Sequence, residues 1–170
     1  MRVFLGCFLT AESAEALSEV QDEQMPVLPG MRRVPVANLH VTLHFLGPVP
    51  VERRGDVLTL ADLLPAEHLV AAVRCFTGFP KPARARVLVA QLEDPDGKLG
   101  GWHELLAGRW PTGEGRRFDP HATLARSRSP VRLPPLPDPG GITVTLQPPA
   151  AYVSETLPEG ARYRRLREQT

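Results

Sequence analysis

The sequence predicts an α+β protein whose sheets are antiparallel or mixed. Stretches with strand patterns and stretches with helix patterns are interleaved along the 170 residues, and the loops among the strands are short. Hydrophobic residues make up 42% of the chain and charged residues 23%, which is ordinary for a folded protein and argues against disorder. A chain of this length suits one large domain, so we expect residues 1–170 to form a single domain.

The expected strands are rich in β-branched and aromatic residues or alternate apolar with polar residues. They cover residues 2–9, 31–36, 38–46, 69–79, 86–92, 121–125, 142–146, 150–155 and 161–166. Two expected helices carry apolar residues at helical spacing over residues 10–24 and 51–64, and a third includes Leu99, Leu105 and Leu106. The proline-rich stretch over residues 133–139 excludes a helix or a central strand, so we expect a loop there.

Composition excludes several classes of protein. The net charge of +1 gives no overall attraction to nucleic acid. Two cysteines, Cys7 and Cys75, do not make a disulfide framework in a chain of this size, and we expect both to be small buried residues. No apolar run approaches the roughly 18 residues that a membrane helix needs, and the run over residues 3–9 is too short for a signal peptide. We therefore expect a cytoplasmic protein without a membrane partner.

One short motif occurs twice, as His40-Val41-Thr42-Leu43 and as His121-Ala122-Thr123-Leu124. On a strand, residues i and i+2 lie on one face about 7 Å apart, so each copy directs an imidazole and a hydroxyl to the same side. Each copy also places a leucine one step further on, which we expect to anchor the opposite face. Two such copies can converge on one ligand.

This set of groups suits in-line displacement at phosphorus. The reaction needs a base beside the nucleophile and an acid beside the leaving group, and His40 and His121 can supply both near neutral pH. The hydroxyls of Thr42 and Thr123 can donate to the non-bridging oxygens without a metal ion, and Arg126 can neutralise the phosphate. The pattern predicts opening of a cyclic phosphodiester or cleavage of RNA, although two structural histidines remain the alternative.

The residues around both motifs resemble a known family. The segment from Arg33 to Gly47 (RVPVANLHVTLHFLG) is similar to the first motif region of the 2H phosphoesterase superfamily, and within it to the RNA 2′,3′-cyclic phosphodiesterases, also called 2′-5′ RNA ligases. The segment from Arg117 to Arg126 (RFDPHATLAR) resembles the second motif, including its trailing arginine. The start of the chain, Arg2 to Gly6, and its end, Tyr152 to Tyr163, are similar to the family's first strand and closing hairpin, so the resemblance covers nearly the whole chain.

This resemblance implies one bilobal 2H phosphoesterase domain over residues 1–170, with two pseudo-symmetric, mainly antiparallel sheets flanking a central cleft and helices outside. It implies metal-independent hydrolysis of an RNA 2′,3′-cyclic phosphate to a 2′-phosphomonoester. His121 would then act as the base and His40 as the acid. The partner would be RNA with a 2′,3′-cyclic phosphate end or a cyclic nucleotide, and we expect a monomer.

Several further residues have two interpretations. His44 occupies a position where the family often has arginine, and simple alternation places it on the cleft side, as a substrate contact at the rim or an exposed bystander. Phe45 can stack on a base of the substrate, but its alternation opposite to His40 favours the core, and Phe118 has the same ambiguity. His68 and His103 lie in or beside helical segments and are expected on the surface.

Three alternative functions stay open. The same cleft could serve a 2H phosphodiesterase or ligase that acts on 2′-5′ oligonucleotides or small cyclic nucleotides. It could also belong to a non-catalytic RNA-binding module. A metal site formed by His40 and His44 is disfavoured, because on a strand the two imidazoles would lie about 13 Å apart. The chain has neither GxGxxG nor a phosphate-binding loop, so we expect no cofactor.

Overall fold

The computed structural model describes residues 1–113 and 115–168. Its helices are α1 (Ala11–Gln24), α2 (Arg54–Ala61) and α3 (Lys98–Arg109), and its 3-10 turns are η1 (Val36–Asn38), η2 (Val51–Arg53) and η3 (Pro82–Arg84). Its strands are β1 (Arg2–Phe8), β2 (Met31–Arg33), β3 (His40–Pro48), β4 (Leu69–Phe79), β5 (Ala85–Leu92), β6 (His121–Val131), β7 (Thr143–Leu146), β8 (Ala150–Leu157) and β9 (Gly160–Arg165).

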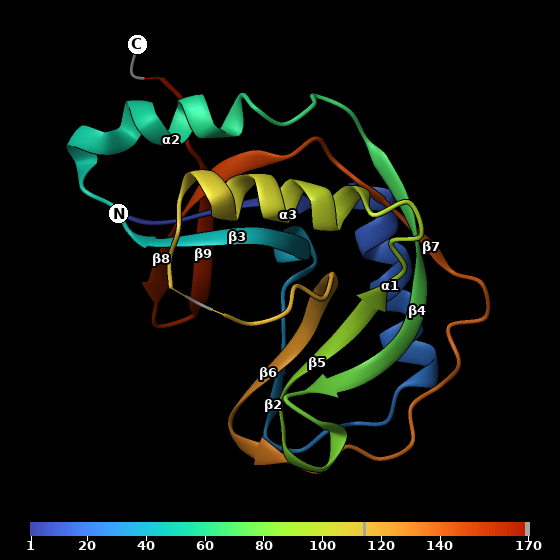
Figure 1. The fold of residues 1–170 in the computed structure, drawn as a ribbon. Helices are drawn as coiled ribbons and strands as arrows, with labels where there is room; N and C mark the ends of the chain where they lie inside the picture. Colours follow the sequence, from blue (N-terminus) through green and yellow to red (C-terminus); the bar gives the residue numbers. More distant parts are fainter. Residues whose placement is uncertain (114, 169–170) are drawn as a thin grey trace.

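The strands form one curled sheet in the order β7-β4-β5-β6-β3-β1-β8-β9, with β2 paired to β6. Every pair is antiparallel, which confirms the predicted fold class. Figure 1 shows β3, β8 and β9 in the upper half and β4, β5 and β6 in the lower half, with α2 and α3 above β3. The two halves join where β3 meets β6, and a single residue pair, Val41 with Ala122, connects these strands.

The core lies on the face of the sheet that the helices cover. On β1, the alternating residues Val3, Leu5 and Cys7 are at most 2% exposed and belong to one cluster with residues from all three helices. Helix α1 begins at the cap residue Thr10, whose hydroxyl accepts a hydrogen bond from the amide of Ser13 at 3.3 Å. The cluster fixes the strands that carry the two motifs.

The two cysteines differ in their surroundings. Cys7 is buried as expected, and burial raises the pKa of its thiol to about 12, which keeps the thiol protonated. Cys75 is only half-buried, contrary to the expectation, and its thiol donates to the amide oxygen of Gln91 at 3.2 Å. Both thiols are free.

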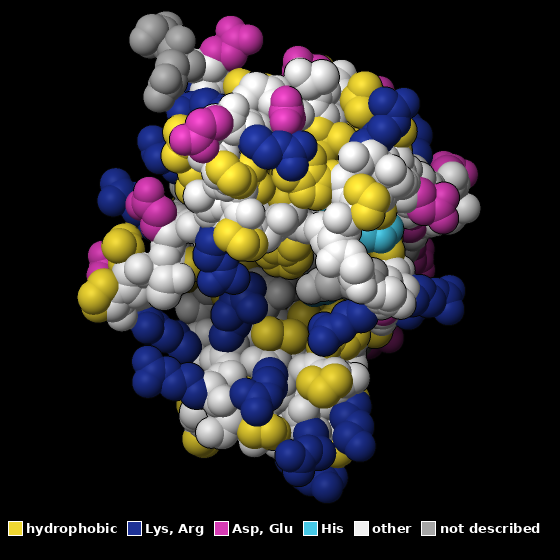
Figure 2. Space-filling model, turned by 60° about the vertical axis from the view of Figure 1, so that its left-hand side comes forward, with side chains coloured by type: hydrophobic (Ala, Val, Ile, Leu, Met, Phe, Trp, Pro, Cys, Tyr) yellow, Lys and Arg dark blue, Asp and Glu magenta, His cyan; other side chains and the backbone are white. Residues whose placement is uncertain are grey.

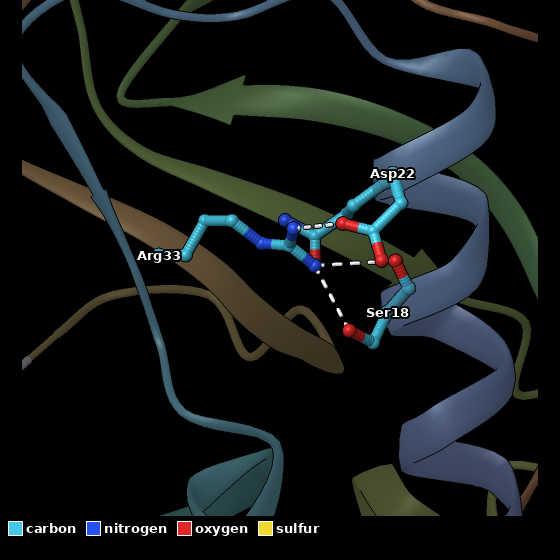
Figure 3. Close-up of polar contacts among 4 residues, drawn as sticks. Ser18, Asp22 and Arg33 are labelled. Atoms are coloured by element: carbon cyan, nitrogen blue, oxygen red, sulfur yellow. Dashed lines mark hydrogen bonds and ion pairs between the residues drawn. The ribbon is translucent and has the colours of Figure 1, made fainter.

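Arg33 attaches β2 to α1 on the face of the sheet that the helices cover. Its guanidinium forms an ion pair with Asp22 and donates to the carbonyl and the hydroxyl of Ser18 at 3.1 and 2.9 Å, as Figure 3 shows. Arg33 opens the segment that resembles the first family motif, and its side chain is bound to residues of α1. Its role in the fold is to hold the short strand β2 against the helix.

Some element bounds differ from the expectation. The strand expected over residues 31–36 ends at Arg33, because Pro35 cannot donate a backbone hydrogen bond and η1 follows it. The helix expected over 51–64 begins as η2 and ends, as α2, at Ala61. Strand β6 continues to Val131, beyond the expected end, while residues 133–139 contain neither helix nor strand, as predicted. Within the described part of the chain, none of the helices has the length and apolar character required to cross a membrane.

Candidate active site

The two His-x-Thr motifs meet at the junction of the two halves of the sheet. Val41 and Ala122, the central residues of the motifs, are paired and completely buried. The residues that flank them therefore project to the opposite face, and the antiparallel direction brings each histidine beside the threonine of the other motif. A cavity of about 750 Å³ opens on that face. All four motif side chains line it: His40, Thr42, His121 and Thr123.

Both motif histidines are held in the same way. Nδ1 of His40 donates to the backbone carbonyl of Asn38 at 2.6 Å, and Nδ1 of His121 donates to the carbonyl of Asp119 at 2.7 Å. A carbonyl oxygen only accepts, so the proton of each neutral ring lies on Nδ1 and the lone pair on Nε2. The repeated geometry leaves both Nε2 atoms available in the cleft for proton transfer.

Aromatic rings surround His40. Phe8 stacks on the imidazole with a centroid distance of 4.9 Å, and Phe4 and Tyr163 lie at 5.0 and 4.9 Å. This burial is the main reason why the pKa of His40 falls from 6.5 to about 4. The hydrogen bond with Asn38 opposes the shift, whereas the nearby charge of Arg126 adds to it. His40 is therefore neutral at neutral pH in the unliganded cleft.

A β-bulge in β3 changes which residues face the cleft. Gly6 of β1 pairs with Thr42, but the preceding residue Leu5 pairs with His44, so Leu43 is an additional residue in β3. The bulge reverses the alternation after it. Phe45 is consequently 56% exposed and lines the cleft, and the interpretation of Phe45 as a core residue is wrong.

Strand β6 contains a bulge at the corresponding position. Val89 of β5 pairs with Thr123 while Leu88 pairs with Ala125, so Leu124 is additional in the second motif. Arg126, which lies five residues after His121, would project to the opposite face on a regular strand. The bulge instead brings Arg126 to the cleft, where it lines the same cavity as the motif residues.

His44 and His103 form the wall of the cleft below α3. Nε2 of His44 donates to the carbonyl of Trp110 at 2.8 Å, and Nδ1 of His103 donates to the carbonyl of Leu43 at 2.7 Å. His44 is only 6% exposed, so the interpretation of His44 as an exposed bystander is wrong. His103 is half-buried and lines the cleft, contrary to the expectation that it lies on the surface. Helix α3 packs against β3, so His103 faces β3 and not the solvent.

Phe118 also lines the cleft, where its ring stacks on His103 at a centroid distance of 4.6 Å and an interplanar angle of 7°. It is half-buried. His68, by contrast, is exposed on the surface, as expected. Of the two phenylalanines considered as stacking platforms, the structure thus places both in the cleft.

The residues that support His121 were not predicted from the sequence. Phe79 contacts the imidazole edge-on at 4.9 Å, and Gln91 is paired with His121 across β5 and β6. The side-chain amide of Gln91 donates to the carboxylate of Asp119 at 2.6 Å, which fixes the residue whose carbonyl holds His121. Gln91 is only 6% exposed, and a lone buried amide in an apolar strand is the signal that could have revealed this support.

The polar groups of the cleft suit a phosphate better than a metal ion. Within residues 1–113 and 115–168, no three His, Cys, Asp or Glu side chains come close enough together to hold a metal ion. His44 uses Nε2 for its hydrogen bond with Trp110. The groups that the cleft offers to a ligand are imidazoles, hydroxyls, a guanidinium and aromatic rings, which suit an anionic phosphate attached to a planar base.

Comparison with known proteins finds relatives along the whole chain. No protein-family model matches the sequence. An RNA 2′,3′-cyclic phosphodiesterase from Thermus thermophilus is 37% identical over 177 aligned residues, covering 96% of this chain and 86% of the relative. An RNA 2′,3′-cyclic phosphodiesterase from Aeropyrum pernix is 28% identical over 110 residues, 62% of each chain.

Solved structures share the fold. The crystal structure of the Thermus thermophilus protein TT0787 superposes with a TM-score of 0.80 and 34% identity, over 98% of this chain and 96% of the other. Escherichia coli LigT in complex with ATP gives a TM-score of 0.78 and 25% identity, over 98% and 94%. The complex of LigT with 3′-AMP gives 0.77 and 27%, over 98% and 95%.

Proposed function

We propose a mechanism from the premise that the chain belongs to the RNA 2′,3′-cyclic phosphodiesterase family and is an enzyme of that activity. In this proposal, the enzyme hydrolyses the cyclic phosphate at an RNA end to a 2′-phosphomonoester and needs no metal ion. The observation that carries this proposal is the repeated anchoring of His40 and His121 by backbone carbonyls. It leaves two imidazole nitrogens in one cleft, which is what acid and base catalysis on opposite sides of a phosphorus atom needs.

In the proposed reaction, Nε2 of His121 removes a proton from water, and the water oxygen attacks phosphorus. The bond between phosphorus and O3′ breaks, and His40 gives O3′ a proton. The product carries a free 3′ hydroxyl and a phosphate on O2′. Solvent returns a proton to His40 and takes one from His121, so the enzyme ends the cycle unchanged.

The substrate itself prepares His40 for this role. The pKa of His40 is about 4 in the unliganded cleft because the ring is buried, so the free enzyme holds it neutral at pH 7. A phosphate anion beside the ring favours the imidazolium and raises that pKa. His40 therefore takes up its proton together with the substrate, and binding and protonation are coupled.

The remaining cleft residues bind the substrate in this proposal. Thr42 and Thr123 donate hydrogen bonds to the non-bridging oxygens, and Arg126 stabilises the charge that grows on them in the transition state. Phe45, exposed in the cleft, stacks on the base next to the cyclic phosphate. His44 contributes the inner wall and contacts the substrate only at the edge of its ring, because its Nε2 is bonded to Trp110.

Product analysis tests the proposal. A 2′,3′-cyclic mononucleotide and an oligonucleotide with a 2′,3′-cyclic phosphate end are incubated with the enzyme in excess EDTA, and the position of the product phosphate is determined by phosphorus NMR. We expect turnover in EDTA and a 2′-phosphate. Loss of turnover that a divalent ion restores would contradict metal independence, and a 3′-phosphate would show that the two histidines act on the opposite oxygen.

A further inference from the structure

Arginines continue from the catalytic cleft along β2 and β6. Arg32 of β2 is paired with Arg126 of β6, so both side chains project from the same face of the sheet. Arg128 follows two residues after Arg126 on β6 and is exposed. The cleft arginine thus has two further arginines near it in these strands, Arg32 beside it on β2 and Arg128 after it on β6.

A fourth arginine lies on the cleft face of β9. Arg165 is paired with Tyr152. The ring centroid of Tyr152 lies 4.5 Å from that of Phe8, and Phe8 stacks on His40. Tyr163, two residues before Arg165, contacts His40 directly at 4.9 Å. Arg165 therefore projects on the same side as the catalytic histidine.

The beginning of β9 lies beside the segment that contains β2 and η1. The guanidinium of Arg32 donates to the carbonyl of Glu159, and Nδ2 of Asn38 donates to the carbonyl of Ala161 at 2.9 Å. The four arginines thus lie along adjoining elements around the His40 side of the cleft. We call this set the arginine band: Arg32, Arg126, Arg128 and Arg165.

Ion pairing differs between neighbouring arginines on β2 and β9. On β2, the neighbouring Arg33 is paired with Asp22, and on β9, Arg164 is paired with Glu155 at 3.8 Å. Within residues 1–113 and 115–168, no carboxylate forms an ion pair with any member of the band. On each of these two strands, one outward arginine has a carboxylate partner, whereas in the described part of the chain the cleft-side arginine has none.

Positive and negative side chains are unevenly distributed over the surface. Figure 2 shows Lys and Arg side chains gathered over the middle and lower part of one face, while Asp and Glu side chains lie mainly in its upper part and at its margins. The net charge of the whole chain is only +1, so the local excess of positive charge comes from its arrangement and not from composition. A surface of this kind attracts a polyanion to one side of the molecule.

We propose that the arginine band binds the phosphodiester backbone of the RNA on the 5′ side of its cyclic phosphate, so that the preferred substrate is an RNA chain and not a cyclic mononucleotide. The inference rests on the proposed function, because it extends the same site. The cyclic phosphate ends the chain at its 3′ side, so the remaining phosphates must leave the cleft past its rim. Guanidinium groups suit these phosphates, and Tyr163 offers an aromatic ring among them.

The test compares two substrates and two matched double variants. The substrates are a 2′,3′-cyclic mononucleotide and a single-stranded RNA of about eight nucleotides with the same cyclic end. Arg128→Gln/Arg165→Gln removes two charges of the band, and the control Arg162→Gln/Arg164→Gln removes two charges from the other face of β9. For each protein, kcat/KM is measured on both substrates between about 50 and 200 mM salt, a range over which phosphate contacts weaken strongly.

We expect the wild type to prefer the oligonucleotide, with a preference that falls as salt rises. In the band variant, the ratio of kcat/KM on the oligonucleotide to kcat/KM on the mononucleotide should fall by about 5- to 20-fold. The slope of log kcat/KM for the oligonucleotide against log salt concentration should become less steep by about 1.4, since each phosphate contact with a single strand contributes about 0.7. The control variant should keep the substrate preference and the salt dependence of the wild type. The ratio of the two substrates cancels any partial loss of folded enzyme, and the single variant Arg128→Gln repeats the test with a smaller perturbation.

The outcomes separate this inference from the proposed function. Equal losses in the two double variants, or an unchanged preference in the band variant, would overturn the role of the band. A wild type that hydrolyses both substrates with the same kcat/KM and the same salt dependence would also overturn it, while leaving the hydrolysis intact. A wild type that hydrolyses neither substrate would instead refute the proposed function.

Discussion

The burial of His40 makes the stability of the fold depend on pH. Its pKa is about 4 in the folded protein and about 6.5 when the ring is exposed, so unfolding at pH 5 takes up a proton. A group with a lowered pKa stabilises the fold fully above the unfolded value and loses this contribution as the pH falls through the folded value. The difference corresponds to about 3 kcal/mol, all of it present at pH 7 and lost between about pH 6.5 and 4.

Urea unfolding of the wild type and of His40→Gln measures this contribution. Glutamine does not titrate, and every other titrating group contributes to both proteins, so the difference between their free energies of unfolding isolates His40. This difference should shift by up to about 3 kcal/mol against the wild type on going from pH 7 to pH 4. A difference that stays constant with pH would refute the argument that aromatic burial keeps His40 neutral.

Further predictions concern the chemistry and the packing of the cleft. His40→Ala and His121→Ala should each reduce kcat by about 10²–10⁴-fold, and the double variant should be little worse than either, because both groups act in one step; additive losses in steady-state kinetics would contradict this. Gly6→Ala should lower the free energy of unfolding by roughly 1–3 kcal/mol, because its Cβ would lie 2.5 Å from the carbonyl oxygen of Val41; an unchanged urea midpoint would show that β1 and β3 can separate. Phe45→Ala should raise KM by about 5- to 160-fold with an unchanged melting temperature, since stacking on a base contributes about 1–3 kcal/mol. An unchanged KM would place the base elsewhere.

The sequence was sufficient for the parts of the site that depend on local pattern. The alternation of apolar and polar residues around His40 and His121 predicts two strands, and the structure confirms both. The repeat of the motif predicts that the two copies can converge on one ligand, and their central residues, Val41 and Ala122, are paired in the structure. These features follow from backbone periodicity, which is a property of a few neighbouring residues.

The parts that depend on distant contacts carry no such local signal. His103 lies on a helix whose apolar residues do not show which neighbouring side packs on β3, and its bond to the carbonyl of Leu43 joins residues 60 positions apart. The same holds for His44, whose partner is the carbonyl of Trp110. A backbone carbonyl as acceptor places no demand on the residue type of the partner, so these contacts leave no pattern in the sequence.

The two bulges explain why simple alternation assigned Phe45 to the core. His40 and Phe45 are separated by five residues, as are His121 and Arg126, and an odd separation puts two side chains on opposite faces of a regular strand. An additional leucine after each threonine restores the cleft face, and adjacent buried residues such as Leu124 and Ala125 are the mark that it leaves in the burial pattern. The same backbone device, repeated in β3 and β6, thus brings the aromatic ring of Phe45 and the guanidinium of Arg126 to the cleft.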